Sequence, residues 1–103
     1  MVAQGELWLL ETPNDKQRPV LVVSRNEAIP VVNNIVVAPV TSTIRRIPTC
    51  IALGPNEGIH HESVANLDNM AAVPKSLLTV RLGSLEHGTR HLICSALRAL
   101  ADC

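Results

Sequence analysis

The chain has 103 residues, 47% of them apolar, which suffices for one domain with a packed core and is too short for two. It contains one Trp, no Phe and no Tyr, and its nine Lys and Arg balance nine Asp and Glu. These numbers exclude a platform of aromatic side chains that stacks bases, and a broad basic surface that holds nucleic acid non-specifically. Any binding site for a polyanion must be small and local, and the core must consist of Val, Leu, Ile and Ala.

Strand patterns fill the first four-fifths of the chain. Short apolar or β-branched segments separated by turn residues predict strands over residues 6–10, 19–24, 35–41, 49–53, 63–68, 71–73 and 78–82. Pro39 cannot donate a backbone hydrogen bond, so we expect an edge position or a bulge in the third segment. Asp68 and Asn69, at the close of the fifth segment, have the composition of a turn.

The end of the chain has the pattern of a helix. Ser84 is the expected N-cap, and Glu86 suits the positive end of the helix dipole. Five apolar residues fall on one face of this helix: Leu92, Ile93, Ala96, Leu97 and Leu100. Many short strands followed by one helix predict a mainly β protein, either a small barrel or a strongly bent sheet.

Neither a membrane span nor a signal peptide is visible in the sequence. The longest apolar runs, such as 20–23 and 35–38, have the length of strands. Cys50, Cys94 and Cys103 form an odd, widely spaced set that matches neither a disulfide framework nor a zinc motif. We therefore expect a cytoplasmic protein with reduced thiols.

The sequence contains no metal motif and no nucleophilic triad. His60 and His61 are adjacent, but neighbouring residues rarely point at one ion, and no Cys or Asp lies at ligand spacing from them. None of the serines stands in the Gly-rich turn that exposes a catalytic nucleophile. We expect a site that works without a metal.

Charge is distributed unevenly along the chain. No acidic residue stands between Glu27 and Glu57, whereas Arg45 and Arg46 lie there, just after the hydroxyl-bearing run 41–43. Such a pair is either a solvated loop tip or a contact for phosphate, to which guanidinium groups and neighbouring hydroxyls are suited. The pattern leaves both interpretations open.

Arg18 and Thr41 stand at the ends of predicted strands. The proline that follows Arg18 restricts its backbone and holds it at the start of a strand. Arg18 there has two possible roles: an ion pair with Asp15 or Glu11, or the binding of a substrate. Thr is common in strands for steric reasons alone. At the end of an apolar strand, however, the hydroxyl of Thr41 is expected to leave the core and face a groove.

Five short segments follow one another in a set order. They are the Gly-Glu-Leu-Trp of 5–8, the Arg-Pro start of 18–24, the Pro-x-Thr of 38–43, the Asp-Asn end of 63–69, and the Leu-Gly-Ser-Leu of 82–85 before the last helix. In this order they resemble the sequence blocks of the MazF/PemK family of toxin endoribonucleases. The resemblance extends over residues 5–100, nearly the whole chain.

This resemblance implies a partly open SH3-like barrel of the CcdB/MazF type, with short helices and a C-terminal α-helix, in one domain over residues 1–103. It also implies a homodimer that cuts single-stranded RNA at short sequences without a metal or cofactor, thereby inhibiting growth and translation. A cognate MazE-like antitoxin would block it. Since the antitoxin segment would oppose the arginines, we expect it to be acidic, extended and partly apolar.

The catalytic arginine and threonine of the family correspond to Arg18 and Thr41. Metal-free cleavage uses the 2′-hydroxyl as nucleophile and leaves 2′,3′-cyclic phosphate and 5′-hydroxyl ends, so the enzyme must orient the hydroxyl and stabilise charge. Arg18 is expected to act mainly electrostatically, and Thr41 to hydrogen-bond the scissile phosphate. No general base is identified. The further RNA-binding candidates are Lys16, Arg25, Ser42, Thr43, Arg45, Arg46, Asp68 and Asn69.

The chain departs from the family pattern at two places. The segment 11–17 is shorter than the corresponding loop of many members, where that loop contacts RNA, and Asn69 stands where many members carry Gln. Both departures concern the RNA sequence that is recognised, and neither affects Arg18 or Thr41.

Two other functions are compatible with a small barrel. One is a CcdB-like, non-enzymatic toxin that binds DNA gyrase, although this chain ends in Ala-Asp-Cys rather than in the Trp-Gly-Ile through which those toxins act. The other is an inactive SH3-like interaction domain, against which the joint presence of Arg18 and Thr41 argues. Inhibition of supercoiling with intact RNA would indicate the first alternative.

Overall fold

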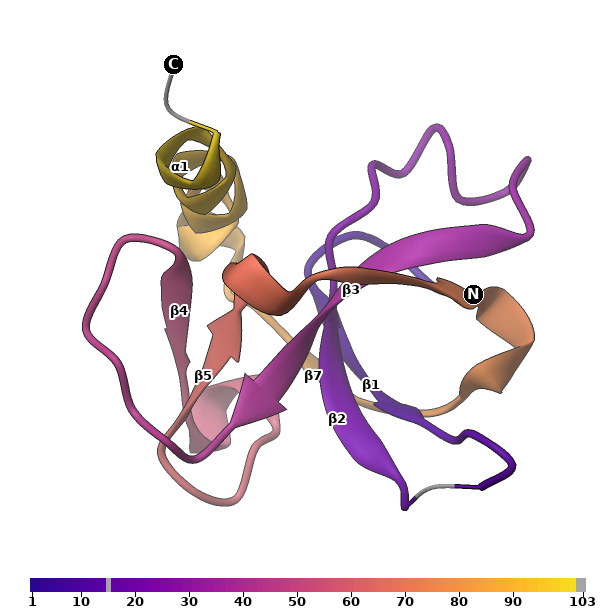
Figure 1. Ribbon diagram of the computed structural model, residues 1–103, viewed down its shortest axis with the longest axis horizontal. Coiled ribbons are helices and arrows are strands. Elements are labelled where there is room, and N and C mark those ends of the chain that lie inside the picture. Colours follow the sequence, from indigo (N-terminus) through magenta and orange to yellow (C-terminus); the bar gives the residue numbers. More distant parts are fainter. Residues whose placement is uncertain (15, 102–103) are drawn as a thin grey trace.

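The computed structural model describes residues 1–14 and 16–101. These residues form seven strands and one α-helix, with short 3₁₀ turns between them (Figure 1). The strands are β1 (Glu6–Leu10), β2 (Arg18–Val22), β3 (Asn34–Thr41), β4 (Cys50–Leu53), β5 (Ser63–Asn66), β6 (Ala71–Pro74) and β7 (Leu78–Ser84). The 3₁₀ turns are η1 (Pro55–Glu57), η2 (Leu67–Asn69), η3 (Lys75–Leu77) and η4 (His87–Thr89), and the helix is α1 (His91–Leu100).

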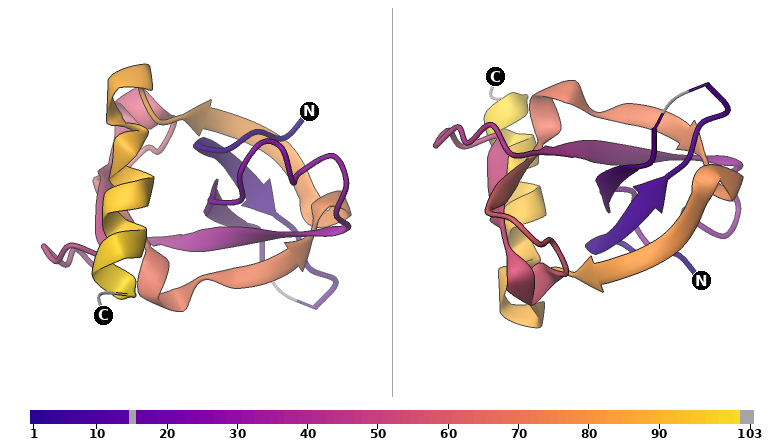
Figure 2. Two further views of the ribbon diagram at one scale, coloured as in Figure 1. Left: turned by 90° about the horizontal axis from the view of Figure 1, so that it is seen from above. Right: turned by 90° about the horizontal axis from the view of Figure 1, so that it is seen from below.

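The strands form one antiparallel sheet that curls on itself. Their order is β4-β5-β3-β2-β1-β7, and β6 lies off this path beside β3. The first half of β3 pairs with β6 and its last residues pair with β5, so that the sheet bends around β3. Helix α1 packs against β4 and η2 at one end of the curled sheet (Figure 2). The expected partly open barrel with a C-terminal helix is confirmed.

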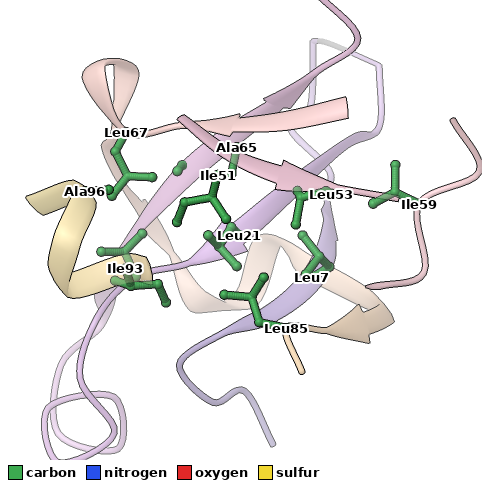
Figure 3. Packing of buried hydrophobic residues seen from close by; sticks show 12 residues of the cluster. Leu7, Leu21, Ile51, Leu53, Ile59, Ala65, Leu67, Leu85, Ile93 and Ala96 are labelled. Atoms are coloured by element: carbon green, nitrogen blue, oxygen red, sulfur yellow. The ribbon is translucent and has the colours of Figure 1, made fainter. Parts of the chain in front are cut away.

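Both faces of the central strands β2 and β3 are buried. Leu21 and Ala38 face the larger apolar cluster, which extends to Ile93 of α1 (Figure 3). The alternate residues Val20 and Val37 face a second cluster on the other side of the sheet. Because strands alternate their side chains between two faces, a strand buried on both sides has a continuous aliphatic sequence. Among the described residues, the buried apolar side chains are all Leu, Val, Ile or Ala, as the composition predicts.

A close backbone contact joins η1, which follows the edge strand β4, to β7 at the other edge of the sheet. A Cβ atom at Gly58, which has a φ of 89°, would lie 2.1 Å from the carbonyl oxygen of Leu82. A Cβ atom at Gly83 would lie 2.2 Å from the carbonyl oxygen of Glu57. Only residues without a side chain permit this approach. The two glycines thus set the spacing between η1 and β7.

Glu6 connects the first strand to the last. Its carboxylate accepts hydrogen bonds from the Ala3 N–H at 2.8 Å and the Trp8 indole at 3.1 Å, and it forms a 2.8 Å ion pair with Arg81 of β7. Burial by itself raises the pKa of the Glu6 carboxyl, but the hydrogen bonds from Arg81, Trp8 and Ala3 together outweigh burial. The pKa of Glu6 is therefore lowered from its ordinary value.

Pro39 is neither at an edge nor in a bulge, so this expectation is wrong. On one side β2 pairs with β3, with Val20 opposite Pro39. On the other side, the pairing of β6 ends at Val37 and that of β5 begins at Val40. Pro39 lies in the gap between these two partners, where the missing N–H costs no ladder hydrogen bond.

The expected start of the helix is also wrong. Ser84 belongs to β7 and pairs with Glu6, and the next residue, Leu85, donates its N–H to the Gly5 carbonyl at 2.8 Å. Glu86 precedes η4, and α1 begins only at His91. Ile93 and Ala96 are buried and Leu92 and Leu97 half-buried against the core, as expected, but Leu100 at the end of the helix is 40% exposed.

Candidate active site

Arg18 and Thr41 lie at the ends of adjacent strands. Arg18 begins β2, Thr41 ends β3, and Val20 lies opposite Pro39 in this antiparallel pair. Continuing that register two residues outward brings Arg18 opposite Thr41, on the face that buries Val20 and Val37 further in. Strand alternation therefore places the Arg18 guanidinium and the Thr41 hydroxyl side by side, just beyond the buried residues of this face.

The two residues line a common cavity of 470 Å³, here called the Arg18 cavity. Its walls come from the start of β2, the end of β3 with the loop that follows, and the adjoining parts of β4, β5 and η2. The lining residues are Arg18, Pro39, Val40, Thr41, Thr43, Arg45, Cys50, Val64, Asn66 and Asn69. This set contains two arginines and no Asp, Glu or His, so its fixed charge is positive and favours an anionic ligand.

The hydroxyl of Thr41 is oriented by the backbone that follows. Its Oγ1 accepts a hydrogen bond from the Thr43 N–H at 3.1 Å. A hydroxyl that already accepts from the backbone still has its own proton to donate. Thr41 is half-buried and can therefore present an O–H donor to a ligand in the Arg18 cavity.

The structure brings Thr43, Arg45 and Asn69 into this cavity together with Arg18 and Thr41. These three side chains are exposed and border it from the loop after β3 and from η2. Arg45 also lines a smaller cavity of 240 Å³ on the β4 side, where Arg46 joins it. Two guanidinium groups from the loop after β3 are thus available near the Arg18 cavity.

Asp68 does not line the Arg18 cavity, in contrast to the expectation that it contacts RNA. Its carboxylate accepts a 2.6 Å hydrogen bond from the hydroxyl of Thr49, a residue only 8% exposed. The backbone N–H of Asp68 donates to Asn66 Oδ1 at 3.0 Å. Asp68 therefore holds the turn after β5, while Asn66 and Asn69 on either side of it border the cavity.

Three other candidates lie elsewhere. Ser42 faces a second cavity, described below, and neither Lys16 nor Arg25 borders either one. The Arg25 carbonyl accepts the Ala28 N–H in the turn after β2. Of the two acids considered as partners for Arg18, Asp15 lies outside the described residues, and Glu11 accepts hydrogen bonds from Gln17 and from the Thr79 hydroxyl.

A second cavity of 470 Å³, here called the Ile59 cavity, lies beside the first. Pro19 and Ser42, which alternate with Arg18 and Thr41 along the same two strand ends, line it together with aliphatic residues and His60 and His61. The Ser63 hydroxyl, which is buried, donates to the His61 carbonyl at 3.0 Å. The two histidines are thus on a different cavity from Arg18 and Thr41.

Asn66, Cys50 and Val64 are cavity residues that the sequence did not indicate. Asn66 and Cys50 lie opposite each other in the β4–β5 pair, and Val64 lies opposite Thr41 in the β3–β5 pair. One sequence signal for a turn was available at Asn66, since an Asn side chain can accept a hydrogen bond from the backbone N–H two residues on and so form an Asx turn. That signal does not place Asn66 in the cavity: like Cys50 and Val64, it reaches the cavity through strand pairing.

Within residues 1–14 and 16–101, no group of three or more His, Cys, Asp and Glu side chains is arranged to hold a metal ion. Cys50 and Cys94 are free thiols, and Cys103 lies outside the described residues. In the same part of the chain, no helix has the length and apolar character needed to cross a bilayer.

The fold and this cavity define a toxin of the MazF type. Residues 3–101 match the family described as PemK-like, MazF-like toxin of type II toxin-antitoxin system, so the chain belongs to this family. It is 39% identical, over 98% of its own length and 94% of the relative's, to the probable endoribonuclease MazF5 of Mycobacterium tuberculosis.

Solved structures agree with this assignment. The Mycobacterium tuberculosis toxin MazF-mt6 superposes with a TM-score of 0.85 at 28% identity, covering 94% of this chain and 96% of that one. An endoribonuclease in complex with its cognate antitoxin, from a mycobacterial species, also superposes with a TM-score of 0.85, at 27% identity and with 99% and 96% coverage. One of these two structures of the same fold is therefore described as an endoribonuclease, and the other as a MazF toxin.

Proposed function

We propose that this endoribonuclease toxin cleaves single-stranded RNA at short sequences without a metal, through the single domain assigned to residues 1–103. The 2′-hydroxyl attacks the adjacent phosphate, the bond to the 5′-oxygen breaks, and the products carry a 2′,3′-cyclic phosphate and a 5′-hydroxyl. One observation carries the proposal: Arg18 and Thr41, from different strands, border one cavity whose lining includes a second arginine and no acid.

The residues of the Arg18 cavity are suited to stabilising a phosphate that gains charge. Arg18 and Arg45 bring permanent positive charge to the strand ends, and the Thr41 O–H, held by the Thr43 N–H, donates to a phosphate oxygen. The lining offers no His, Asp or Glu as a general base. Electrostatic stabilisation and orientation of the 2′-hydroxyl are therefore the contributions that we assign to this chain.

The proposed partners follow from the same charge distribution. An extended, acidic and partly apolar segment of a cognate antitoxin would lie over the Arg18 cavity and exclude RNA from it. The structure of a related endoribonuclease in complex with its cognate antitoxin supports a partner of this kind. We further propose that the protein acts as a homodimer in the cytoplasm, where free thiols stay reduced.

Cleavage of a long single-stranded RNA in EDTA tests the proposal. Fragments should carry 2′,3′-cyclic phosphate and 5′-hydroxyl ends, and a substrate with one 2′-deoxynucleotide at the cut position should resist cleavage. Normal cutting of the deoxy substrate would contradict attack by the 2′-hydroxyl. Intact RNA combined with inhibition of DNA supercoiling would instead indicate a gyrase-binding toxin.

A further inference from the structure

Asn66 occupies a position in the Arg18 cavity that only strand pairing reveals. It is the last residue of β5, which lies between β3 and β4 in the sheet. Cys50 lies opposite Asn66 in the β4–β5 pair, and Thr41 lies opposite Val64, two residues earlier along β5. Asn66 therefore borders the cavity from the strand next to the one that carries Thr41.

A backbone contact decides which polar atom of the Asn66 amide remains available to a ligand. The Asp68 N–H lies 3.0 Å from Asn66 Oδ1. Because a backbone N–H can only donate, the amide oxygen must face it, and the remaining polar group of Asn66 is the Nδ2 amino group. Among the described residues, no hydrogen bond occupies this amino group, which leaves it as a donor for a ligand.

Thr49 fixes the turn that follows Asn66 through two hydrogen bonds. The carboxylate of Asp68 accepts the 2.6 Å hydrogen bond from the buried Thr49 hydroxyl, and the Thr49 carbonyl accepts the Leu67 N–H at 3.0 Å. Rotating the Asn66 amide would break its bond to Asp68. Its donor is therefore preorganised, which is the condition for discrimination between ligands.

Asn69 provides the contrast within the same cavity. It is exposed at the end of η2, and no hydrogen bond among the described residues fixes its amide. Its side chain can therefore turn either its oxygen or its amino group toward a ligand. The fixed donor of Asn66 is therefore suited to discriminating between RNA bases, and the adaptable amide of Asn69 to contacting RNA of any sequence.

We propose that Asn66 is a specificity-determining residue, whose Nδ2 group donates a hydrogen bond to an acceptor on an RNA base next to the cleaved phosphate. This assignment rests on the proposed endoribonuclease function. The acceptor is a carbonyl oxygen or an unprotonated ring nitrogen, since a base that presents an amino group there would leave two donors facing each other.

The arrangement favours a base over a phosphate as the partner of Asn66. Arg18, Arg45 and Thr41 already supply charged and hydroxyl donors suited to phosphate oxygens. Phosphates are the same at every nucleotide of an RNA and carry no sequence information, whereas the edges of the bases differ in their hydrogen-bond donors and acceptors. A neutral donor with one fixed orientation contributes little to the binding of a polyanion but can discriminate among bases.

Asn66→Asp tests this assignment with almost no change of shape. One carboxylate oxygen still accepts the Asp68 N–H, while the group that faces the cavity changes from a donor to an acceptor. Two short RNAs that differ at one base compete for the enzyme, and sequencing of 5′ ends from a random RNA pool identifies every cut site. We expect the preference between an acceptor-bearing and a donor-bearing base to change by about 10-fold or more.

The ratio of the two cleavage rates does not depend on the fraction of folded enzyme, so partial unfolding of Asn66→Asp cannot imitate this result. Asn56→Asp is the matched control, because Asn56 is exposed in η1, outside both cavities, and the same charge is introduced. It should cut the same sites as the wild type. Thr49→Val, which removes the support of Asp68, should weaken the preference without reversing it.

Two results would overturn the assignment. If Asn66→Asp cuts every site more slowly with unchanged preference, the Nδ2 group contacts a phosphate or has a structural role only. If it cuts the same sites at the wild-type rate, the amino group contacts nothing in the reaction. Wild-type protein that leaves all RNA intact in the same assay would overturn the proposed function itself, which separates the two failures.

Discussion

The Arg18 cavity and the Ile59 cavity have the same volume of 470 Å³ and share the ends of β2 and β3. The first is lined by arginines and polar residues, however, and the second largely by apolar residues. Arg18 and Thr41 face the first, and their neighbours Pro19 and Ser42 face the second. A strand alternates its side chains, so a shift of one residue would exchange the two linings. The register of β2 against β3 thus determines where the charged site forms.

The supporting structure differs as well. The Arg18 cavity lies against a network of side-chain hydrogen bonds that includes Thr49, Asp68 and Asn66. The Ile59 cavity is bordered by Gly58 and Leu82, from the tight backbone contact between η1 and β7. Changes at the first should therefore alter RNA cleavage with the fold intact, and changes in the walls of the second should alter stability.

The largest difference between the cavities should come from Arg18→Ala. Because we propose that Arg18 stabilises the reacting phosphate, its removal is expected to lower the cleavage rate by on the order of 10³ or more, and Arg18→Lys should restore only part of it. Arg18 is exposed, so thermal unfolding should be nearly unchanged. His60→Ala, a change in the Ile59 cavity, is the control and should cleave at the wild-type rate. A comparable loss in both variants would show that the cavities do not differ in function.

Thr41→Val should have the next largest effect. The variant keeps the β-branched shape but removes the O–H donor and the acceptor of the Thr43 N–H, so we expect the cleavage rate to fall by about 10². Thr41→Ser keeps the hydroxyl and should retain most of the activity. Single-turnover rates at saturating protein measure this step. Wild-type rates for Thr41→Val would remove the hydroxyl from the mechanism.

The parts of the site that follow from strand alternation could be predicted from the sequence. The aliphatic runs at 20–23 and 35–38 identify two strands buried on both faces, and a polar residue at the outer end of each indicates where the chain leaves the core. Arg18 and Thr41 satisfy this description. The resemblance to the toxin family added their roles, which remain proposals for the tests above.

The parts that depend on pairing between distant segments could not be predicted. Asn66 reaches the cavity because β5 pairs with both β3 and β4, and no local pattern contains that information. Ser84 has the local chemistry of an N-cap, but it ends β7, and its pairing with Glu6 of β1 prevails over that preference. Pro39 avoids the edge because two other strands share one side of β3. Local preferences therefore located the elements but not their partners.

Gly83→Ala tests whether the backbone contact beside the Ile59 cavity determines stability. A Cβ atom 2.2 Å from the Glu57 carbonyl oxygen forces η1 away from β7, and we expect a loss of about 3 kcal/mol in the free energy of unfolding. Gly88→Ala is the matched control, since no atom lies within 4 Å of its added Cβ. It should change stability by less than about 0.5 kcal/mol. Urea unfolding measures both, and equal stability of the two variants would refute the role of the η1–β7 contact.

Glu6→Gln should have the smallest effect, and its sign depends on pH. Glu6 of β1 binds Arg81, which lies next to the Ile59 cavity wall on β7, and its pKa is lowered in the folded protein. A carboxyl with a lowered folded pKa stabilises the fold above its unfolded pKa, and this contribution is lost as the pH falls through the folded pKa. Because Arg81 is half exposed, the wild type should exceed Glu6→Gln by no more than about 1 kcal/mol near pH 7.

The difference should shrink as the pH falls below the ordinary pKa of a Glu carboxyl and through the lowered pKa of Glu6 in the folded protein, because the protonated carboxyl resembles the amide. Urea unfolding of both proteins across this range gives the two stability curves. Converging curves would assign part of the acid sensitivity to the β1–β7 ion pair, whereas parallel curves would mean that Glu6 does not link protonation to folding. RNA cleavage by Glu6→Gln near pH 7 should equal that of the wild type, since Glu6 borders neither cavity.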